Sequence, residues 1–152
     1  MKARFLQLLK MTGNTIDMQL MRYINLFAKV SNVSTTHCFV YNNIIIFAVP
    51  YDKVYMAIGK NGGNMKRLGE ILRKKIKVVE LPRDESQEQI ENFVSHIVEP
   101  ISFNKIEIYE GIVSISAGRQ NKAALIGRNR AREQELEDIL KKFFHVQKLK
   151  II

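Results

Sequence analysis

Apolar residues recur at helical spacing in the first part of the chain and then change to strand-like runs. From Thr15, which can cap a helix, apolar side chains return every three or four positions as far as Ala28, a pattern typical of an amphipathic helix. Two β-rich runs within 38–49 then flank Asn42 and Asn43. Asparagine tolerates the left-handed backbone of a tight turn, so this segment is predicted to form a β-hairpin.

The rest of the first half places short helical and strand patterns around a glycine-rich turn. A short helix is predicted over 51–58, the turn follows at 59–62, and a longer helix is predicted over 63–75. A strand is predicted over 77–81 and ends at Pro82.

The second half shows the same order of elements after a polar linker at 83–88. Ser86 is a candidate N-cap, and Gln89, three residues on, is its candidate partner in a capping box. A hairpin turn is expected at Glu110 and Gly111. The predicted helices, hairpin and final strand cover 87–98, 106–117, 120–126, 131–144 and 146–152.

Each half therefore reads α-β-β-α-α-β. This order predicts an α+β fold in which a three-stranded sheet is covered on one face by helices. We expect two such domains, at 16–82 and 83–152, and an N-terminal extension at 1–15 to which no role can be assigned.

The two halves also repeat in sequence. Residues 57–74 read AIGKNGGNMKRLGEILRK, and residues 125–142, 68 positions later, read LIGRNRAREQELEDILKK. Seven aligned pairs are identical: Ile58/Ile126, Gly59/Gly127, Asn61/Asn129, Leu68/Leu136, Ile71/Ile139, Leu72/Leu140 and Lys74/Lys142. Two copies with so long a period indicate a duplicated domain rather than a solenoid.

Charge is distributed unevenly between the halves. The chain has 152 residues, 46% of them apolar, and a net charge of +9. Residues 1–82 carry 13 Lys and Arg against 4 acids, whereas 83–152 carry 11 of each. A polyanionic partner attracted mainly by the first half is expected. The alternative, a basic charge that serves only solubility, explains this asymmetry poorly.

Other features favour a cytoplasmic protein without a cofactor. No apolar run approaches the ~20 residues that span a bilayer, so no membrane partner is expected. Cys38 lies in a strand-like run and is interpreted as a small buried hydrophobe. The three histidines lack neighbours at metal-ligand spacing and are interpreted as surface or core-edge residues: His37, His96 and His145.

The first glycine-rich turn has the chemistry of a phosphate site. Gly59 and Gly62 allow positive φ and close backbone approach, and the following helix offers free N–H groups. The candidate binding residues of this copy are Gly59, Lys60, Asn61, Gly62, Lys66 and Arg67. The alternative is a simple link between two helices with a solvated basic face. Ile58 and its counterpart Ile126 could line a base-accepting groove or belong to the core.

The second turn departs from this pattern, because Arg130 replaces the second glycine. Its side chain could hinder backbone contact, or supply a planar donor to phosphate or a base. Glu133 and its neighbours make the next helix acidic, which should repel a bound strand. The candidate residues of this copy are Arg119, Lys122, Gly127, Arg128, Asn129, Arg130 and Arg132.

A family resemblance joins these features. RYINLF (22–27), IIIFAV, AIGKNGGNMKRLGEIL and KKIKVVE (74–80) resemble the first KH module of archaeal NusA-like proteins. EPISFNKIEIYEG and LIGRNRAREQELEDILKKFF resemble their second. The resemblance implies two tandem type II KH domains that bind RNA in transcription termination. It makes the two turns the loops that clamp about four nucleotides each. It does not include the polymerase-binding region or S1 domain of bacterial NusA proteins, so a direct contact with RNA polymerase is not assumed.

Three classes of function were weighed. The first is a non-catalytic protein that binds single-stranded RNA, with a transcription complex as a candidate partner. The second is a protein-docking adaptor with KH domains as scaffold, which suits the neutral second half. The third is an enzyme, for which the sequence offers no nucleotide-binding Gly-x-x-x-x-Gly-Lys-Ser/Thr loop and no arrangement of catalytic residues. Oligomeric state is left open.

Overall fold

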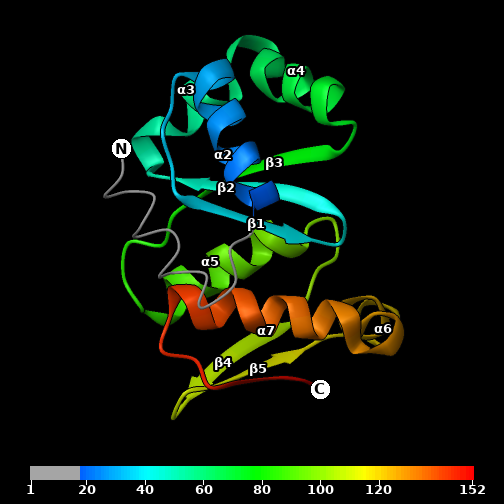
Figure 1. The fold of residues 1–152 in the computed structure, drawn as a ribbon. Helices are drawn as coiled ribbons and strands as arrows, with labels where there is room; N and C mark the ends of the chain where they lie inside the picture. Colours follow the sequence, from blue (N-terminus) through cyan, green and yellow to red (C-terminus); the bar gives the residue numbers. More distant parts are fainter. Residues whose placement is uncertain (1–17) are drawn as a thin grey trace. The chain divides into compact units, whose positions relative to one another are not determined.

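The chain divides into two compact units, with the boundary between Glu80 and Leu81 (Figure 1). The computed structural model describes residues 18–152. The predicted cap Thr15 and the extension at 1–15 lie outside the described residues.

The first unit is built on a three-stranded mixed sheet. Its central strand β2 pairs antiparallel with β1 and parallel with β3. In chain order the described elements are α2 (Met18–Ser31), β1 (His37–Tyr41), β2 (Ile44–Val49), the 3₁₀ helix η1 (Tyr51–Lys53), α3 (Val54–Ile58), the 3₁₀ turn η2 (Lys60–Gly62), α4 (Gly63–Leu72) and β3 (Lys75–Glu80).

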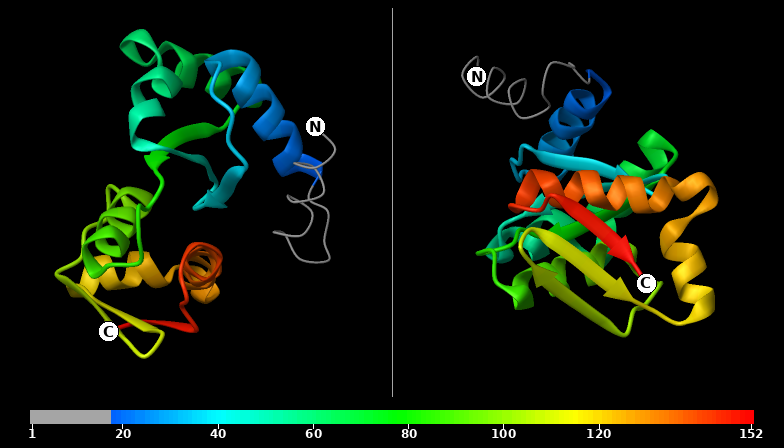
Figure 2. Two further views of the ribbon diagram at one scale, coloured as in Figure 1. Left: turned by 90° about the vertical axis from the view of Figure 1, so that its left-hand side faces the viewer. Right: turned by 90° about the horizontal axis from the view of Figure 1, so that it is seen from below.

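The helices of the first unit pack on one face of its sheet (Figure 2). The register aligns Cys38, Phe47 and Val78 across the three strands, and all three belong to the core beneath the helices. Phe27 of α2 stacks on Phe47 with ring centroids 4.2 Å apart. Leu68 of α4 is fully buried in the same core. The core therefore fixes where α4, and the turn before it, stand relative to the sheet.

The second unit repeats this plan. Central strand β5 pairs antiparallel with β4 and parallel with β6. Its elements are α5 (Gln87–Val98), β4 (Lys105–Tyr109), β5 (Ile112–Ser116), α6 (Arg119–Ile126), the 3₁₀ turn η3 (Arg128–Arg130), α7 (Ala131–Phe143) and β6 (Lys148–Ile151). The predicted α+β class and the element order of two tandem KH-like domains are confirmed.

Both predicted hairpin turns are present, and each uses left-handed backbone. Asn42 and Asn43 have φ of 51° and 63°, and Glu110 and Gly111 have φ of 48° and 78°. Two successive residues at positive φ match the right-handed twist of the strands they join. The hairpin predicted from the asparagine pair is thus confirmed, and both asparagines adopt the left-handed backbone on which the prediction rested.

Several predicted element boundaries differ from the structure. The strand expected over 77–81 spans Lys75–Glu80. The helix expected over 63–75 ends at Leu72, because Arg73 takes the left-handed conformation with φ of 55° and terminates it. Lys75 instead begins β3, where it pairs with Ile44. At the end of the chain the last strand begins at Lys148 rather than at 146.

The cap of α5 is confirmed only in part. The Ser86 side chain accepts a hydrogen bond from the Gln89 backbone N–H, as predicted. The reciprocal bond of a capping box is not formed, because Asp84 Oδ1 accepts the Ser86 N–H at 2.9 Å. The Gln89 side chain accepts instead from the Arg83 N–H. These two bonds tie the linker to the first turn of the helix.

Within residues 18–152 no helix combines the length and the apolar character needed to cross a membrane. Cys38 is buried, as its strand pattern predicted, and it forms no disulfide.

Candidate nucleic-acid interface

The first glycine turn has a backbone that few residues can adopt. Gly59 lies at φ 82° and ψ 168°, and Asn61 and Gly62 are left-handed with φ of 55° and 71°. The Gly59 N–H donates to the Tyr55 carbonyl at 3.0 Å, and the Gly62 N–H donates to the Gly59 carbonyl at 3.1 Å. The first bond ends α3, and the second forms the turn that leads into α4 four residues later.

The two glycines serve different purposes. A Cβ on Gly59 would lie 2.7 Å from Asn64 Cγ, and Asn64 Nδ2 donates to the Met56 carbonyl at 3.1 Å. Gly59 therefore leaves room for a side chain that ties α4 to α3. A Cβ on Gly62 would meet nothing within 4 Å. The space beside Gly62 is open to solvent, so another chain's backbone could approach there.

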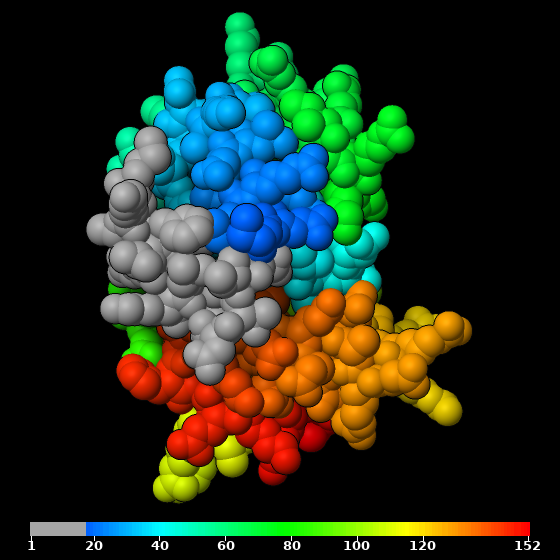
Figure 3. Space-filling view, viewed as in Figure 1, coloured from blue at the N-terminus to red at the C-terminus, as the bar shows by residue number. Residues whose placement is uncertain are grey.

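The predicted cations of the first copy lie around this turn. Lys60, Asn61, Lys66 and Arg67 are all exposed, and no side chain caps the start of α4. Figure 3 shows side chains of the α4 segment, in green, projecting from the surface of the first unit. The N-terminus of a helix carries partial positive charge, which adds to that of these side chains. The arrangement can hold an anion such as a phosphate.

The second turn copies the backbone of the first despite its different sequence. Gly127 lies at φ 75° and ψ 171°, Asn129 at φ 56° and Arg130 at φ 60°. The hydrogen bonds also recur, from the Gly127 N–H to the Ala123 carbonyl at 2.9 Å and from the Arg130 N–H to the Gly127 carbonyl at 3.2 Å. The duplication therefore preserves the shape of the turn.

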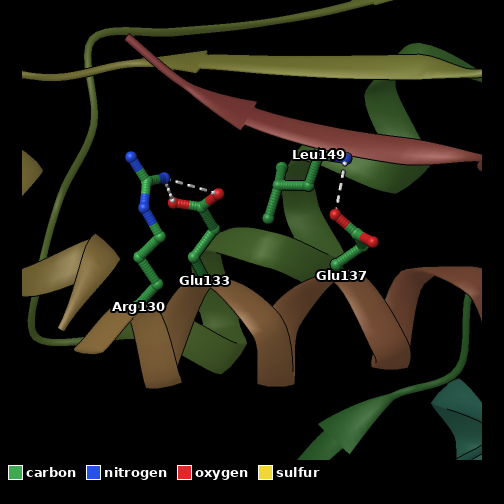
Figure 4. A network of polar contacts seen from close by, with 4 residues as sticks. All are labelled: Arg130, Glu133, Glu137 and Leu149. Carbon is green, nitrogen blue, oxygen red and sulfur yellow. Dashed lines mark hydrogen bonds and ion pairs between the residues drawn. The ribbon is translucent and has the colours of Figure 1, made fainter. Parts of the chain in front are cut away.

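Arg130 occupies the left-handed position that glycine fills in the first turn. This conformation costs an ordinary residue about 1–2 kcal/mol relative to right-handed backbone. The Arg130 guanidinium donates from Nη1 to both oxygens of Glu133, at 3.1 and 3.3 Å (Figure 4). Arg132 pairs with Glu135 at 2.8 Å. Two of the predicted cations of this copy are thus partly neutralised within the unit.

The remaining candidates of the second copy are distributed along α6 and its turn. Arg119, Arg128 and Asn129 are exposed, and Lys122 is half-buried. Gly127 has the same constraint as Gly59, because an added Cβ would lie 2.6 Å from Arg132 Cγ. In each unit, the predicted residues therefore lie at the turn and on the helices next to it. Their assignment to RNA binding stays a prediction.

Ile58 and Ile126 occupy equivalent places one residue before the turns. Both are half-buried, which suits either of the two roles considered for them.

Sequence reasoning missed an apolar surface just before the first turn. The exposed fractions of Tyr51, Tyr55 and Met56 are 67%, 91% and 50%. Only Val54 and Ala57 of this segment pack into the core. A helix of five residues is too short for its periodicity to show which side faces outward, so the only available signal was the pair of tyrosines four positions apart.

A carboxylate anchors the helix that follows the second turn. Glu137, with 17% of its side chain exposed, accepts from the Leu149 N–H of β6 at 3.2 Å (Figure 4). Glu137 also pairs with Lys141 at 3.0 Å. Burial raises the pKa of Glu137, but the bonds from Lys141 and Leu149 and the charges of Lys141 and Lys148 outweigh it, so the pKa is lowered. The charged form of Glu137 therefore holds α7 to the edge of the sheet.

Histidines and acids form no metal centre among the residues the structure describes, where no group of three or more His, Cys, Asp or Glu is gathered. His37 is half-buried, and burial lowers its pKa. His96 and His145 are exposed, and His145 Nδ1 lies 2.6 Å from Glu85 Oε1.

Comparison with known proteins supports the resemblance seen in the sequence. No model of a known protein family matches the chain. A protein of Methanocaldococcus jannaschii named "Probable transcription termination protein NusA" is 26% identical over 133 residues, covering 85% of this chain and 70% of that protein. The solved structure titled "Crystal structure of APE1850" is 29% identical, with a TM-score of 0.60, and the match covers 90% of this chain and 100% of that one. The resemblance to an archaeal NusA-like protein is thereby confirmed.

Proposed function

We propose that this chain is a non-catalytic protein that binds single-stranded RNA and acts in transcription termination or antitermination. Residues 16–82 and 83–152 are its two KH modules. The observation that carries the proposal is the repetition of one unusual exposed turn, with the same three positive-φ positions, 68 residues apart. The name of the Methanocaldococcus jannaschii relative supports a role beside the transcription machinery, and RNA polymerase or its complex is the proposed partner.

The first turn is the principal phosphate clamp. A phosphate placed beside Gly62 meets no side chain of that residue, and the start of α4 presents its positive end to it. Lys60, Lys66 and Arg67 supply three exposed cations, against which Glu70 is the one acid on α4. Bases then lie along the side of the turn where Ile58 is half-exposed.

The second turn contributes less. Its Arg130 side chain fills the place of the open glycine and is already engaged by Glu133. A strand leaving this turn along α7 also meets exposed acidic positions such as Asp138. We therefore assign it to extending the bound strand, with Arg119 and Arg128 as its contacts.

The test is a charge reversal confined to the exposed turn. Lys60→Asp together with Asn61→Asp should abolish most affinity for single-stranded RNA, because two phosphate contacts become repulsive. Aspartate tolerates the left-handed backbone of position 61, so the fold should persist, as circular dichroism and thermal melting would show. The matched change, Arg128→Asp with Asn129→Asp, should cost less. Unchanged binding by the first variant would remove the first turn from the proposal.

A second function, that of a protein-docking adaptor, is favoured by one observation. The second unit neutralises part of the charge at its own turn through the Arg130–Glu133 and Arg132–Glu135 pairs. Such a surface suits a protein partner better than a polyanion. Co-purification from cell extract with and without ribonuclease separates the two, since an adaptor keeps its partner after the RNA is destroyed.

A further inference from the structure

The segment before the first turn exposes three large apolar side chains together. Tyr51, Tyr55 and Met56 lie on η1 and α3, and the Tyr55 side chain is almost fully exposed, at 91%. Single exposed apolar residues are ordinary on protein surfaces, but a group of them beside a candidate ligand site indicates a contact surface. We call these three residues the tyrosine platform.

The platform is not needed to build the fold. At the positions 68 residues later, the second unit has Arg119, Ala123 and Ala124. That unit forms one eight-residue helix at the equivalent place, followed by the same turn and the same sheet topology, without any of the three side chains. Packing therefore does not explain the Tyr55 ring, which is 91% exposed.

The platform is continuous with the phosphate-binding turn. The Tyr55 carbonyl accepts the Gly59 N–H, so Tyr55 lies one helical turn, about 5.4 Å, before the start of the glycine turn. Tyr51 and Tyr55 are four positions apart, a spacing at which side chains lie on the same side of a helix. A strand whose phosphates lie at the turn would present a neighbouring base to this ring.

Charge around the platform indicates the chemistry of its ligand. Lys53 and Lys60 flank it and are exposed, and Asp52 is the one acid between 51 and 67. Aromatic rings set among cations are the arrangement that holds single-stranded nucleic acid, because every base has a π-face and every nucleotide a negative charge. An apolar protein partner would need no such charge.

We propose that Tyr55 stacks on a base of single-stranded RNA, with Tyr51 and Met56 completing the contact surface. This inference rests on the proposed function, because it needs the RNA backbone at the first turn. It assigns base contact to the first unit alone, while the second unit contributes charge.

The experiment uses the full chain and fluorescent RNA oligomers of about 12 nucleotides, both oligoadenylate and oligouridylate. Tyr55→Ala should weaken binding about five- to hundredfold, whereas Tyr55→Phe, which keeps the ring, should stay within about twofold. Tyr109→Ala is the matched control, since Tyr109 is 74% exposed on the β4–β5 hairpin of the second unit and should be neutral. Equal affinity of Tyr55→Ala and the unmodified chain would overturn the stacking proposal.

A second arm locates the base. Oligomers lacking one base at a time should show a position where base removal weakens binding by the unmodified chain but not by Tyr55→Ala. Such coupling is specific to a ring–base contact. Absence of any coupled position would contradict stacking even if Tyr55→Ala weakened binding.

These experiments also distinguish a failure of the stacking proposal from a failure of the proposed RNA-binding function. If the charge reversal at Lys60 and Asn61 abolishes binding while Tyr55→Ala does not weaken it, stacking is wrong and the clamp stands. If the unmodified chain fails to bind either oligomer, or binds them independently of Lys60 and Asn61, the proposed RNA clamp is wrong and the platform proposal falls with it.

Discussion

Arg130 Nη1 donates to both carboxylate oxygens of Glu133, at 3.1 and 3.3 Å, across one turn of the helix that begins at the second glycine turn. The equivalent of Glu133 in the first unit is Met65, which packs against the core and offers no such acceptor. The two turns therefore share a backbone but differ in the charge that they present to a ligand.

Removing this acceptor should strengthen RNA binding at the second turn. The test uses a chain whose first turn is disabled by Lys60→Asp and Asn61→Asp. In that chain Glu133→Gln should raise the residual affinity for RNA about two- to threefold, because an exposed ion pair stabilises the bound position of Arg130 by no more than about 1 kcal/mol. Fluorescence anisotropy with single-stranded RNA measures this affinity. Asp138→Asn makes the same charge change on α7, where Asp138 contacts Gln134, and should have a smaller effect. Equal gains from both variants would mean that only net charge matters.

The two glycines of the first turn should respond differently to alanine. Gly59→Ala should lower the free energy of unfolding by about 2–3 kcal/mol, because the methyl group meets Asn64 at 2.7 Å and the backbone is strained for any side chain. Gly62→Ala places its methyl in open space and should cost only about 1 kcal/mol for left-handed backbone. Urea denaturation of both variants tests the difference, and equal losses would contradict the close packing of Asn64.

Glu137 should make the second unit sensitive to acid. Its pKa is lowered in the folded state, so its charged form contributes stability at pH values above the unfolded pKa, near 4.3. That stability is lost as the pH falls through the lower folded-state pKa. Glu137→Gln should reduce the free energy of unfolding by about 1.5–3 kcal/mol at neutral pH and flatten its acid dependence, because the bond from the Leu149 N–H loses its charge assistance.

Denaturation curves between neutral pH and about pH 3 measure this effect, a range that spans the ordinary glutamate pKa. Glu107→Gln is the control, since Glu107 pairs with Lys105 on an exposed surface and its loss should be undetectable. If the free energy of unfolding of Glu137→Gln fell with acid as steeply as that of the unmodified chain, the role assigned to the carboxylate would be wrong.

Phosphate and base contacts should separate in their response to salt. With about five phosphates engaged, the logarithm of the association constant should fall against log salt with a slope near −3.5 for the unmodified chain. Lys60→Ala should make the slope shallower by about 0.7, the contribution of one phosphate contact. Tyr55→Ala should weaken binding without changing the slope. A titration over a range of sodium chloride concentrations measures both, and a flat response in the unmodified chain would contradict a phosphate clamp.

The cap of α5 offers a local test of the linker. Ser86→Ala should lower the free energy of unfolding by about 1 kcal/mol, because the Gln89 N–H loses its acceptor. Ser95→Ala, the same exchange in the interior of that helix, should be neutral or slightly stabilising, since alanine is the better helix former. A thermal melt of each variant is sufficient, and equal losses would rule out a special role for Ser86.

Much of the fold was predictable because its signals are local. The two left-handed asparagines of the first hairpin, the Ser86 cap and the apolar period of α5 each depend on a few consecutive residues. The end of α4 was not predictable, because Arg73 has no intrinsic preference for left-handed backbone. The pairing of Lys75 with Ile44 overrides its local helical pattern.

The candidate site also has features that the sequence predicts and features that it does not. Repetition of the glycine turn and the surplus of cations near it could be found from the sequence, since both are patterns of residue type and spacing. The engagement of Arg130 by Glu133 depends on rotamers, and the outward direction of Tyr55 depends on which side of a five-residue helix meets the core.

By itself the sequence determined that one α-β-β-α-α-β unit occurs twice, that each copy has a turn led by glycine, and that only the first copy has a net positive charge. Those properties follow from the composition of the chain and the spacing of its residue types, which can be read from the sequence alone. Only the tertiary structure decided that Gly59 makes room for Asn64, that the space beside Gly62 is open, and that the second turn neutralises part of its own charge. These are outcomes of packing between residues brought together by the core, and the spacing of residue types does not specify which atoms will meet.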